Sequence, residues 1–287
     1  MNYLELLRKS SDATGNILCM GLDPVPAALP HPEKNISNRI SDYFEELFDE
    51  MQKRGLTPAA FKPNLGYYAA LDRPLDGQFE GSLALARVLK MLREAFSGIP
   101  VILDAKRGDI ATSSTNYAKE AFEAWRADCV TVSPYMGTDS VMPFAFADKG
   151  VYVLNRTSNP GGADLQNLRM EDQAPLYITV ARTIAAWHQD SSGVGAVVGA
   201  TNLKELEDIA RYFADQDIPM LIPGVGSQGG SAPEVMEKLR KAGYPICLAR
   251  INSSSGLTHP WKKAPAPDDY RERVMANLAK LIKETSL

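Results

Sequence analysis

The sequence predicts an α/β protein, a single (β/α)8 TIM barrel. Short apolar runs alternate with longer amphipathic stretches along all 287 residues, and they form eight pairs. The runs are almost continuously apolar, as in parallel strands that helices cover on both faces. Eight parallel strand–helix units also close such a barrel. Because no linker divides the chain and closed barrels reach this length, we expect residues 1–287 to form one domain.

The apolar runs give the expected strands in order. Pro63 cannot donate a hydrogen bond to a sheet, so the second strand should stop there. The third strand begins with the apolar run 101–103, and Gly108 permits a turn near its end. The strands are expected at residues 17–20, 59–64, 101–110, 129–132, 151–154, 195–198, 220–222 and 246–249.

The stretches between the runs predict helices. Residues 40–51 carry apolar side chains at the i, i+3, i+4, i+7 spacing of one helix face. The proline-rich patch 260–267 is interpreted as a loop before the last helix. The other helices are expected over residues 85–96, 114–126, 177–188, 206–213 and 274–282.

Composition limits the partners and the compartment. A formal net charge of -4 argues against a general nucleic-acid or membrane surface, so an anionic ligand needs a local site. No apolar run approaches a membrane span, and the first 16 residues lack a signal-peptide core. The three cysteines lie in apolar runs, as expected for buried reduced thiols of a cytoplasmic protein. The three histidines lie far apart in the sequence, which argues against a histidine metal site.

Charged residues gather at the end of the third strand. Asp104, Lys106 and Asp109 lie within six positions, and strand residues two apart face the same way. A carboxylate and an ammonium group held side by side there indicate charge chemistry. For an isolated Asp-x-Lys, the alternative is a salt bridge that caps the strand.

Polar residues at other strand ends favour a site over that salt bridge. Asp23 follows the first strand, Lys62 and Asn64 end the second, Ser140 follows the fourth and Gln228 the seventh. The carboxyl ends of barrel strands converge on one mouth, so these side chains should meet there. Positive and negative groups alternate among them, which satisfies each buried charge.

Two glycine-rich loops, after the fifth and the seventh expected strands, should also lie at this mouth of the barrel. Residues 224–229 match G-x-G-x-x-G, but no acidic residue lies about 20 positions on, so a dinucleotide site is not expected. After a seventh barrel strand, such a loop cradles phosphate together with the loop after strand eight. A plain glycine turn is the alternative. The other loop, 155–162, suits a mobile cover.

Four strand-end motifs form a set. They are Gly-Leu-Asp-Pro at 21–24, Phe-Lys-Pro-Asn at 61–64, Asp-x-Lys-x-x-Asp at 104–109 and Pro-Gly-Val-Gly-x-Gln-Gly-Gly at 223–230. In this order, each after its own strand, they resemble the orotidine 5′-phosphate decarboxylase family in its longer bacterial type. The resemblance covers essentially the whole chain.

This resemblance implies decarboxylation of orotidine 5′-monophosphate to UMP by a homodimer, without cofactor or metal. It implies a catalytic array of Lys62, Asp104, Lys106 and Asp109, with Asp109 reaching into the partner's site. We expect Lys106 to stabilise the carbanion left at C6 and then to protonate it. The substrate-binding residues that the resemblance implies are Asp23, Asn64, Ser113, Ser140, Pro160, Gln228, Gly229 and Gly230.

One motif departs from the family pattern. After strand eight such proteins commonly read Asn-Ser-Ser-Arg-Gly, and the arginine holds the phosphate, whereas residues 252–256 read Asn-Ser-Ser-Ser-Gly. We expect Arg250 to supply the missing cation at the mouth. The alternatives are an Arg250 that turns outward, and a phosphate site made by the hydroxyls and amides of Ser254 to Gly256.

Two other functions compete with this one. The third-strand motif also resembles that of 3-keto-L-gulonate 6-phosphate decarboxylase, which works through Mg2+ and an enediolate. Ser140 and Gln228, on the pyrimidine side, argue against it. A nucleotide-binding barrel without turnover is the non-enzymatic alternative, favoured only by the altered arginine position.

Overall fold

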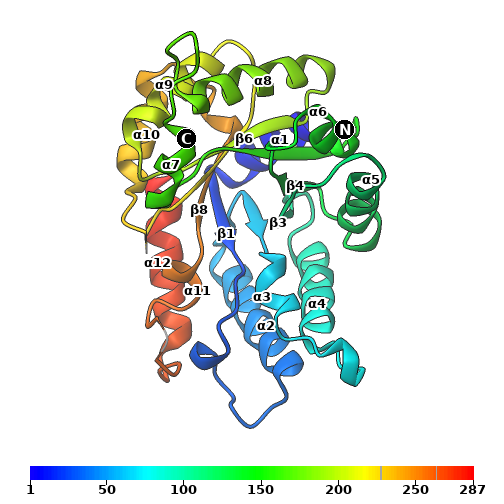
Figure 1. The fold of residues 1–287 in the computed structure, drawn as a ribbon. Helices are drawn as coiled ribbons and strands as arrows, with labels where there is room; N and C mark the ends of the chain where they lie inside the picture. Colours follow the sequence, from blue (N-terminus) through cyan, green and yellow to red (C-terminus); the bar gives the residue numbers. More distant parts are fainter. Residues whose placement is uncertain (227, 263) are drawn as a thin grey trace.

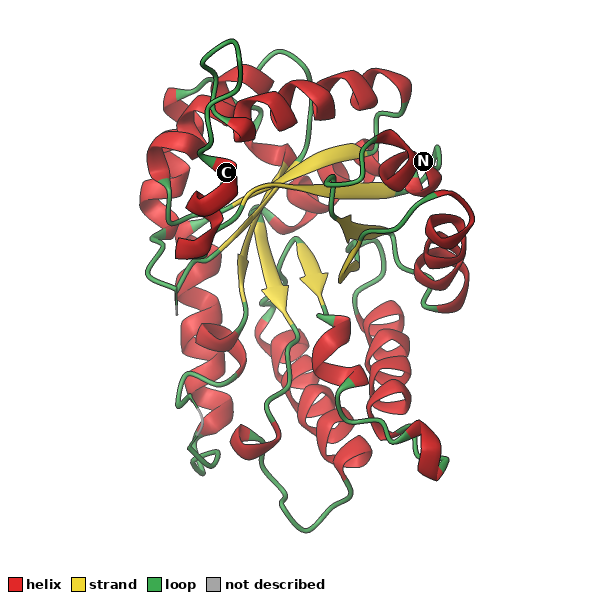
Figure 2. Cartoon of the chain, viewed as in Figure 1, coloured by secondary structure: helices red, strands yellow, loops and turns green. Residues whose placement is uncertain are grey.

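The chain forms the closed barrel that the sequence predicts, with its strands in the middle and helices around them (Figures 1 and 2). The computed structural model describes residues 1–226, 228–262 and 264–287. Its parallel strands pair in the order β2-β1-β8-β7-β6-β5-β4-β3. Parallel bridges from Phe61 to Val101 and from Asn64 to Asp104 join β2 to β3 and close the ring. The strands are β1 Leu18–Gly21, β2 Ala60–Lys62, β3 Ile102–Arg107, β4 Cys129–Val132, β5 Gly150–Arg156, β6 Val194–Val198, β7 Met220–Pro223 and β8 Ala249–Ser253.

The second and eighth strands show what the apolar pattern could and could not predict. The second strand ends at Lys62, as the missing N–H of Pro63 requires. The expected start of the eighth strand at Ile246 is wrong, because Ile246–Leu248 form a 3-10 turn and β8 begins at Ala249. A partly buried turn can be as apolar as a buried strand, so the run alone did not distinguish them.

Helices follow the strands around the barrel, and their apolar faces pack on it. The expected helix 40–51 lies inside α2, and the expected helix 114–126 is α5 continued by a π-helical turn, Glu120–Ala124. The helices after β1 are α2 Ile36–Arg54, α3 Leu65–Ala69, α4 Glu80–Ala95, α5 Ala111–Lys119, α6 Thr138–Val141, α7 Ala163–Gln166, α8 Leu176–Asp190, α9 Leu203–Phe213, α10 Ala232–Lys241, α11 Ser255–Thr258 and α12 Tyr270–Glu284.

Helix α1 (Tyr3–Thr14) is not among the elements predicted from the sequence, and it covers the amino ends of the strands. A capping box starts it, because the Asn2 side chain accepts from the Glu5 N–H and the Glu5 side chain accepts from the Asn2 N–H. Tyr3 packs directly over Gly150, the first residue of β5, where a Cβ would collide with its ring. The barrel is therefore plugged at this end, and any open cavity lies at the other.

Three further findings concern the described residues alone. No helix in them has the length and apolar character needed to cross a membrane. They hold no group of three or more His, Cys, Asp or Glu side chains placed to bind a metal ion. Cys19 and Cys129 are buried, Cys247 is partly buried, and all three are free thiols.

Candidate active site

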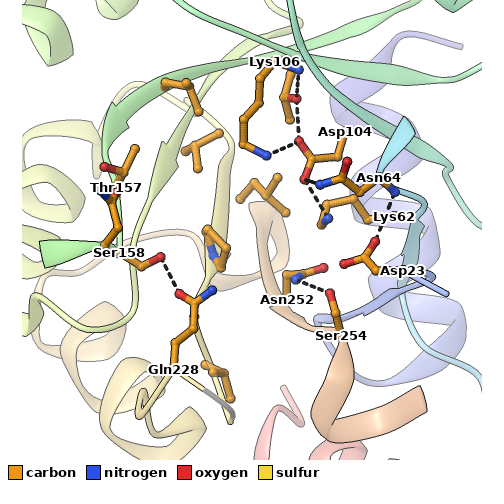
Figure 3. A pocket seen from close by; sticks show the side chains of 18 of the residues that line it. Asp23, Lys62, Asn64, Asp104, Lys106, Thr157, Ser158, Gln228, Asn252 and Ser254 are labelled. Carbon is orange, nitrogen blue, oxygen red and sulfur yellow. Dashed lines mark hydrogen bonds and ion pairs between the residues drawn. The ribbon is translucent and has the colours of Figure 1, made fainter. Parts of the chain in front are cut away.

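A cavity of about 440 Å³ opens at the carboxyl ends of the strands. One side of it is charged and carries Asp23, Lys62, Asn64, Asp104 and Lys106, which come from the ends of β1, β2 and β3. Figure 3 shows these side chains gathered together, with Ser158 and Gln228 on the opposite side. Apolar side chains from three later strands complete the wall: Leu154, Val197 and Leu221. The cavity is therefore lined by charged side chains and by apolar side chains.

Asp104 is the centre of the charged side. Its Oδ2 accepts a hydrogen bond from Lys62 Nζ at 2.8 Å, and its Oδ1 accepts one from Lys106 Nζ at 2.6 Å. Asn64 Nδ2 lies 3.5 Å from Oδ2. The Asp104 and Lys62 side chains are almost completely buried, whereas that of Lys106 is half exposed and faces the cavity. One carboxylate therefore holds two ammonium groups, of which Lys106 is the accessible one.

Electrostatic interactions keep Asp104 and Lys62 ionised. Burial acts to raise the pKa of Asp104, but the charges of Lys62 and Lys106 outweigh it and hold that pKa well below its usual value. Burial acts to lower the pKa of Lys62, yet the carboxylates of Asp23 and Asp104 raise that pKa above its usual value. At neutral pH the array thus contains a carboxylate and a buried ammonium group, fixed before any ligand binds.

The backbone at Lys106 is strained. Its φ of 43° lies in the left-handed region, which residues with a Cβ adopt at a cost of about 1–3 kcal/mol. The pairing of β3 with β4 is irregular over this stretch, between Leu103 and Arg107. The sequence correctly predicted that Asp104 and Lys106 point the same way, but nothing in the sequence showed this bulge.

Other predicted residues lie at or beside the cavity. Asp23 Oδ1 accepts the Asn64 backbone N–H at 3.1 Å, which ties β1 to β2 at the mouth. Gln228 Oε1 accepts a hydrogen bond from Ser158 Oγ at 2.6 Å, across the open side. Gly230 and Gly256 line a neighbouring pocket of about 330 Å³, which shares Val225 with the cavity. Gly229 has a φ of 92°, a conformation that favours glycine.

Like Gly229, Gly230 and Gly256, four further predicted residues do not line the cavity in this chain. Asp109 lies past the end of β3, where its carboxylate accepts the Ile110 N–H at 2.8 Å. Ser113 is exposed on α5. Ser140 is buried in α6, and its hydroxyl donates to the Ser133 carbonyl at 3.4 Å. Pro160 is exposed in a short turn, although its neighbour Asn159 reaches the cavity.

The structure contradicts the expectation that Arg250 reaches the mouth. Arg250 and Asn252 share one face of β8, but only Asn252 lies at the carboxyl end and lines the cavity. The Arg250 guanidinium is completely buried and donates to the Leu7 carbonyl and to Ser10 Oγ of α1, both at 2.6 Å. It therefore neither turns outward nor meets a ligand, because its position near the start of β8 aims it at the plugged end.

Several cavity residues were not predicted. Thr131, Leu154 and Val197 belong to strand interiors that look like ordinary core in sequence. Ser158 lies in a loop that the sequence marks only by its glycines, whereas Ser254, which belongs to the alternative phosphate site, does line the cavity. Strand alternation could have indicated Leu154 and Val197, because each lies near the carboxyl end of its strand.

Comparisons with known proteins agree with this geometry. The model of the family described as "Orotidine 5'-phosphate decarboxylase / HUMPS family" matches residues 16–246. An orotidine 5'-phosphate decarboxylase of Variovorax paradoxus is 40% identical over 276 residues, which covers 95% of this chain and 93% of that protein. The solved OMP decarboxylase of Leishmania donovani matches with 31% identity and a TM-score of 0.75, and the match covers 99% of this chain and 99% of that protein.

A second solved structure is larger than this chain. The UMP synthase of Leishmania donovani matches with a TM-score of 0.78 and 33% identity over 98% of this chain. The match covers 56% of the synthase, so this chain spans little more than half of that protein. The family match, the sequence identity and the closed barrel agree: the chain belongs to the orotidine 5'-phosphate decarboxylase / HUMPS family.

Proposed function

We propose that this protein decarboxylates orotidine 5′-monophosphate to UMP. The observation that carries the proposal is the array at the cavity, in which buried Asp104 holds Lys62 on one oxygen and Lys106 on the other. Its relatives that are named orotidine 5'-phosphate decarboxylase support the same reaction. An ammonium group facing a half-apolar cavity suits a reaction that develops negative charge on carbon.

Lys106 is the proposed acid of the reaction. Loss of CO2 from C6 of the pyrimidine leaves an electron pair in an sp2 orbital that the ring delocalises poorly. A fixed ammonium group beside C6 stabilises that pair electrostatically and then transfers a proton to it, leaving a neutral amine. Lys106 is the accessible cation of the array, and its Nζ lies 2.6 Å from Asp104 Oδ1.

Asp104 positions the Lys106 ammonium group, and Lys62 balances the charge of Asp104. In the proposed complex the substrate carboxylate lies near Asp104, and the repulsion between them falls as CO2 leaves. Lys62 neutralises Asp104 from the buried side, so that the carboxylate stays ionised while it holds Lys106. The apolar residues Leu154 and Val197 line the same cavity and offer an environment that suits neutral CO2 better than a carboxylate.

The phosphate is assigned to the glycine loop after β7. Gly224 and Gly226 have φ values of 105° and 92°, which favour glycine and form a tight turn, and in this turn the N–H groups of Gly226 and Gly230 donate to carbonyls of the loop itself. Gln228 is proposed to bridge the pyrimidine and the phosphate, while Ser254 supplies a hydroxyl in place of the family's arginine. Because the phosphate does not react, its binding energy serves positioning. Orotidine without its phosphate should therefore react far more slowly than the nucleotide.

The remaining roles need a second copy of the chain. We propose a homodimer in which Asp109 enters the partner's cavity and Ser113 joins Asp23 at the ribose, since neither Asp109 nor Ser113 lines its own cavity. Mixing Lys106→Ala with Asp109→Ala subunits places both defects in one site of a hybrid dimer and leaves the other intact. If both variants alone are inactive, the mixture should recover about a quarter of wild-type activity. No recovery, despite proven subunit exchange, would contradict the shared site.

Lys106→Ala tests the function itself. We expect the variant to fold, to bind UMP, and to lose nearly all turnover measured by the loss of orotidylate absorbance. Lys90→Ala, which removes an exposed lysine of α4, is the matched control and should keep full activity. Near-normal turnover by Lys106→Ala would remove this residue from the mechanism. Turnover of the wild-type enzyme should continue in the presence of a chelator, whereas the Mg2+-dependent alternative reaction would stop.

A further inference from the structure

Thr131 lies beside the catalytic array, and its hydroxyl makes three hydrogen bonds. It donates to Asp104 Oδ1 at 2.9 Å, and it accepts the backbone N–H groups of Ala105 at 3.1 Å and of Lys106 at 2.9 Å. One donor and two acceptors are the full capacity of a hydroxyl. The residue is third in β4 and only 1% exposed. Every hydrogen bond that this side chain can make is therefore directed at the strand that carries Asp104 and Lys106.

These contacts replace part of the strand pairing. In the β3–β4 ladder Leu103 pairs with Val130 and Arg107 with Val132, so three residues of β3 lie opposite Thr131 alone. Two of their N–H groups turn to the Thr131 side chain. Buried N–H groups left without a partner are costly, so the hydroxyl is what makes this irregular pairing tolerable.

The bulge is also where the backbone of Lys106 takes its positive φ of 43°. A residue with a Cβ stays in that region only when its surroundings hold it there. The Thr131 hydroxyl holds the backbone end of Lys106 through its N–H and orients Asp104 Oδ1, which in turn receives the ammonium end. One hydroxyl thus acts on both ends of the same side chain.

We propose that Thr131 is a positioning residue, which fixes the Lys106 ammonium group where the reaction needs it. This inference rests on the proposed function, in which Lys106 is the acid. It assigns Thr131 no contact with the reacting atoms. Substrate affinity comes from other groups, the glycine loop and the strand ends, so loss of the hydroxyl should affect turnover without affecting binding.

The experiment replaces the hydroxyl while keeping the shape of the side chain. Thr131→Val should lower kcat by about 10- to 100-fold, the cost of a misplaced reacting group, with KM and the Kd for UMP within about twofold of wild type. Thr131→Ser should restore kcat, because it retains the hydroxyl. Thr285→Val is the matched control, since that buried hydroxyl donates only to carbonyls of its own helix, and its kcat should not change.

Thr131→Cys keeps the test decisive if the valine variant does not fold. A thiol is a weak donor and acceptor, so kcat should fall clearly below that of Thr131→Ser. Equal kcat for the serine and cysteine variants, or normal kcat for valine, would overturn the positioning role. A loss of UMP affinity as large as the loss of kcat would also overturn it, because that pattern reports a structural residue.

Lys106→Ala, measured in the same series, tests the catalytic role of Lys106 separately from the positioning role of Thr131. An inactive Lys106→Ala beside a normal Thr131→Val removes only the role of Thr131. An active Lys106→Ala removes the proposed function and this inference with it.

Discussion

Lys62 and Arg250 are both buried cations inside one barrel, but their surroundings satisfy them differently. Lys62 ends β2 at the open end, and Asp104 accepts its hydrogen bond at 2.8 Å. Arg250 lies near the start of β8, and its hydrogen bonds among the described residues go to uncharged oxygens: the carbonyls of Leu7, Cys247 and Ala249, and Ser10 Oγ. The two environments move the two pKa values in opposite directions.

Carboxylates near Lys62 overcome the effect of burial and raise its pKa, whereas burial lowers the pKa of Arg250. Cys19 on β1 is influenced by both cations, although burial still raises the pKa of its thiol to about 12. A buried cation is therefore not by itself a functional site. Lys62 belongs to a network that opens on a cavity, and Arg250 fastens α1 to the bottom of the barrel.

Of the substitutions of these two cations, Lys62→Met should have the larger effect on activity. Removing the buried ammonium group leaves Asp104 with Lys106 as its remaining lysine partner and alters the field around that lysine. We expect kcat to fall by about 10²–10³-fold, the usual cost of losing one preorganised electrostatic group. The measurement is steady-state decarboxylation, with UMP binding as the check on folding. Activity close to wild type would mean that Lys62 is as structural as Arg250.

Arg250→Met is the matched experiment at the plugged end. It removes the guanidinium donor of the Leu7, Cys247 and Ala249 carbonyls, although Ser10 still donates to Leu7 and Ser11 to Cys247, and it relieves the burial of a charge. We expect the free energy of unfolding, from urea titration, to fall by about 1–3 kcal/mol. Turnover of the folded fraction should stay within about twofold, as for distant independent sites. A larger loss of kcat would restore a functional role for Arg250.

A smaller effect is expected from acid, and it should distinguish the two cations. The pKa of Asp104 is lowered on folding, so its pairing adds stability above the unfolded pKa of about 3.9, and this is lost as pH falls through the lower folded value. The stability difference between wild type and Asp104→Asn should therefore shrink by about 1 kcal/mol from about pH 5 to about pH 3. The corresponding difference for Arg250→Met should stay constant, because its partners do not titrate.

Chain patterning by itself determined the barrel and most of the charged array. Apolar runs that alternate with amphipathic stretches specify parallel strands under helices, and the carboxyl ends of eight such strands meet at one mouth. Asp23, Lys62, Asn64, Asp104, Lys106 and Gln228 could be placed there in advance, because each follows a recognisable strand, and the cavity contains all six.

Which buried groups line the site depends on the three-dimensional packing of the strands. Arg250 and Asn252 look equivalent in sequence, yet the depth of each residue along β8 directs one to α1 and the other to the cavity. The positive φ of Lys106 and the three hydrogen bonds of Thr131 arise from the register of β3 against β4. The position of a residue between the two ends of the barrel and the register of its strand both depend on how neighbouring strands pair. The pattern of residue types within one strand does not contain that information.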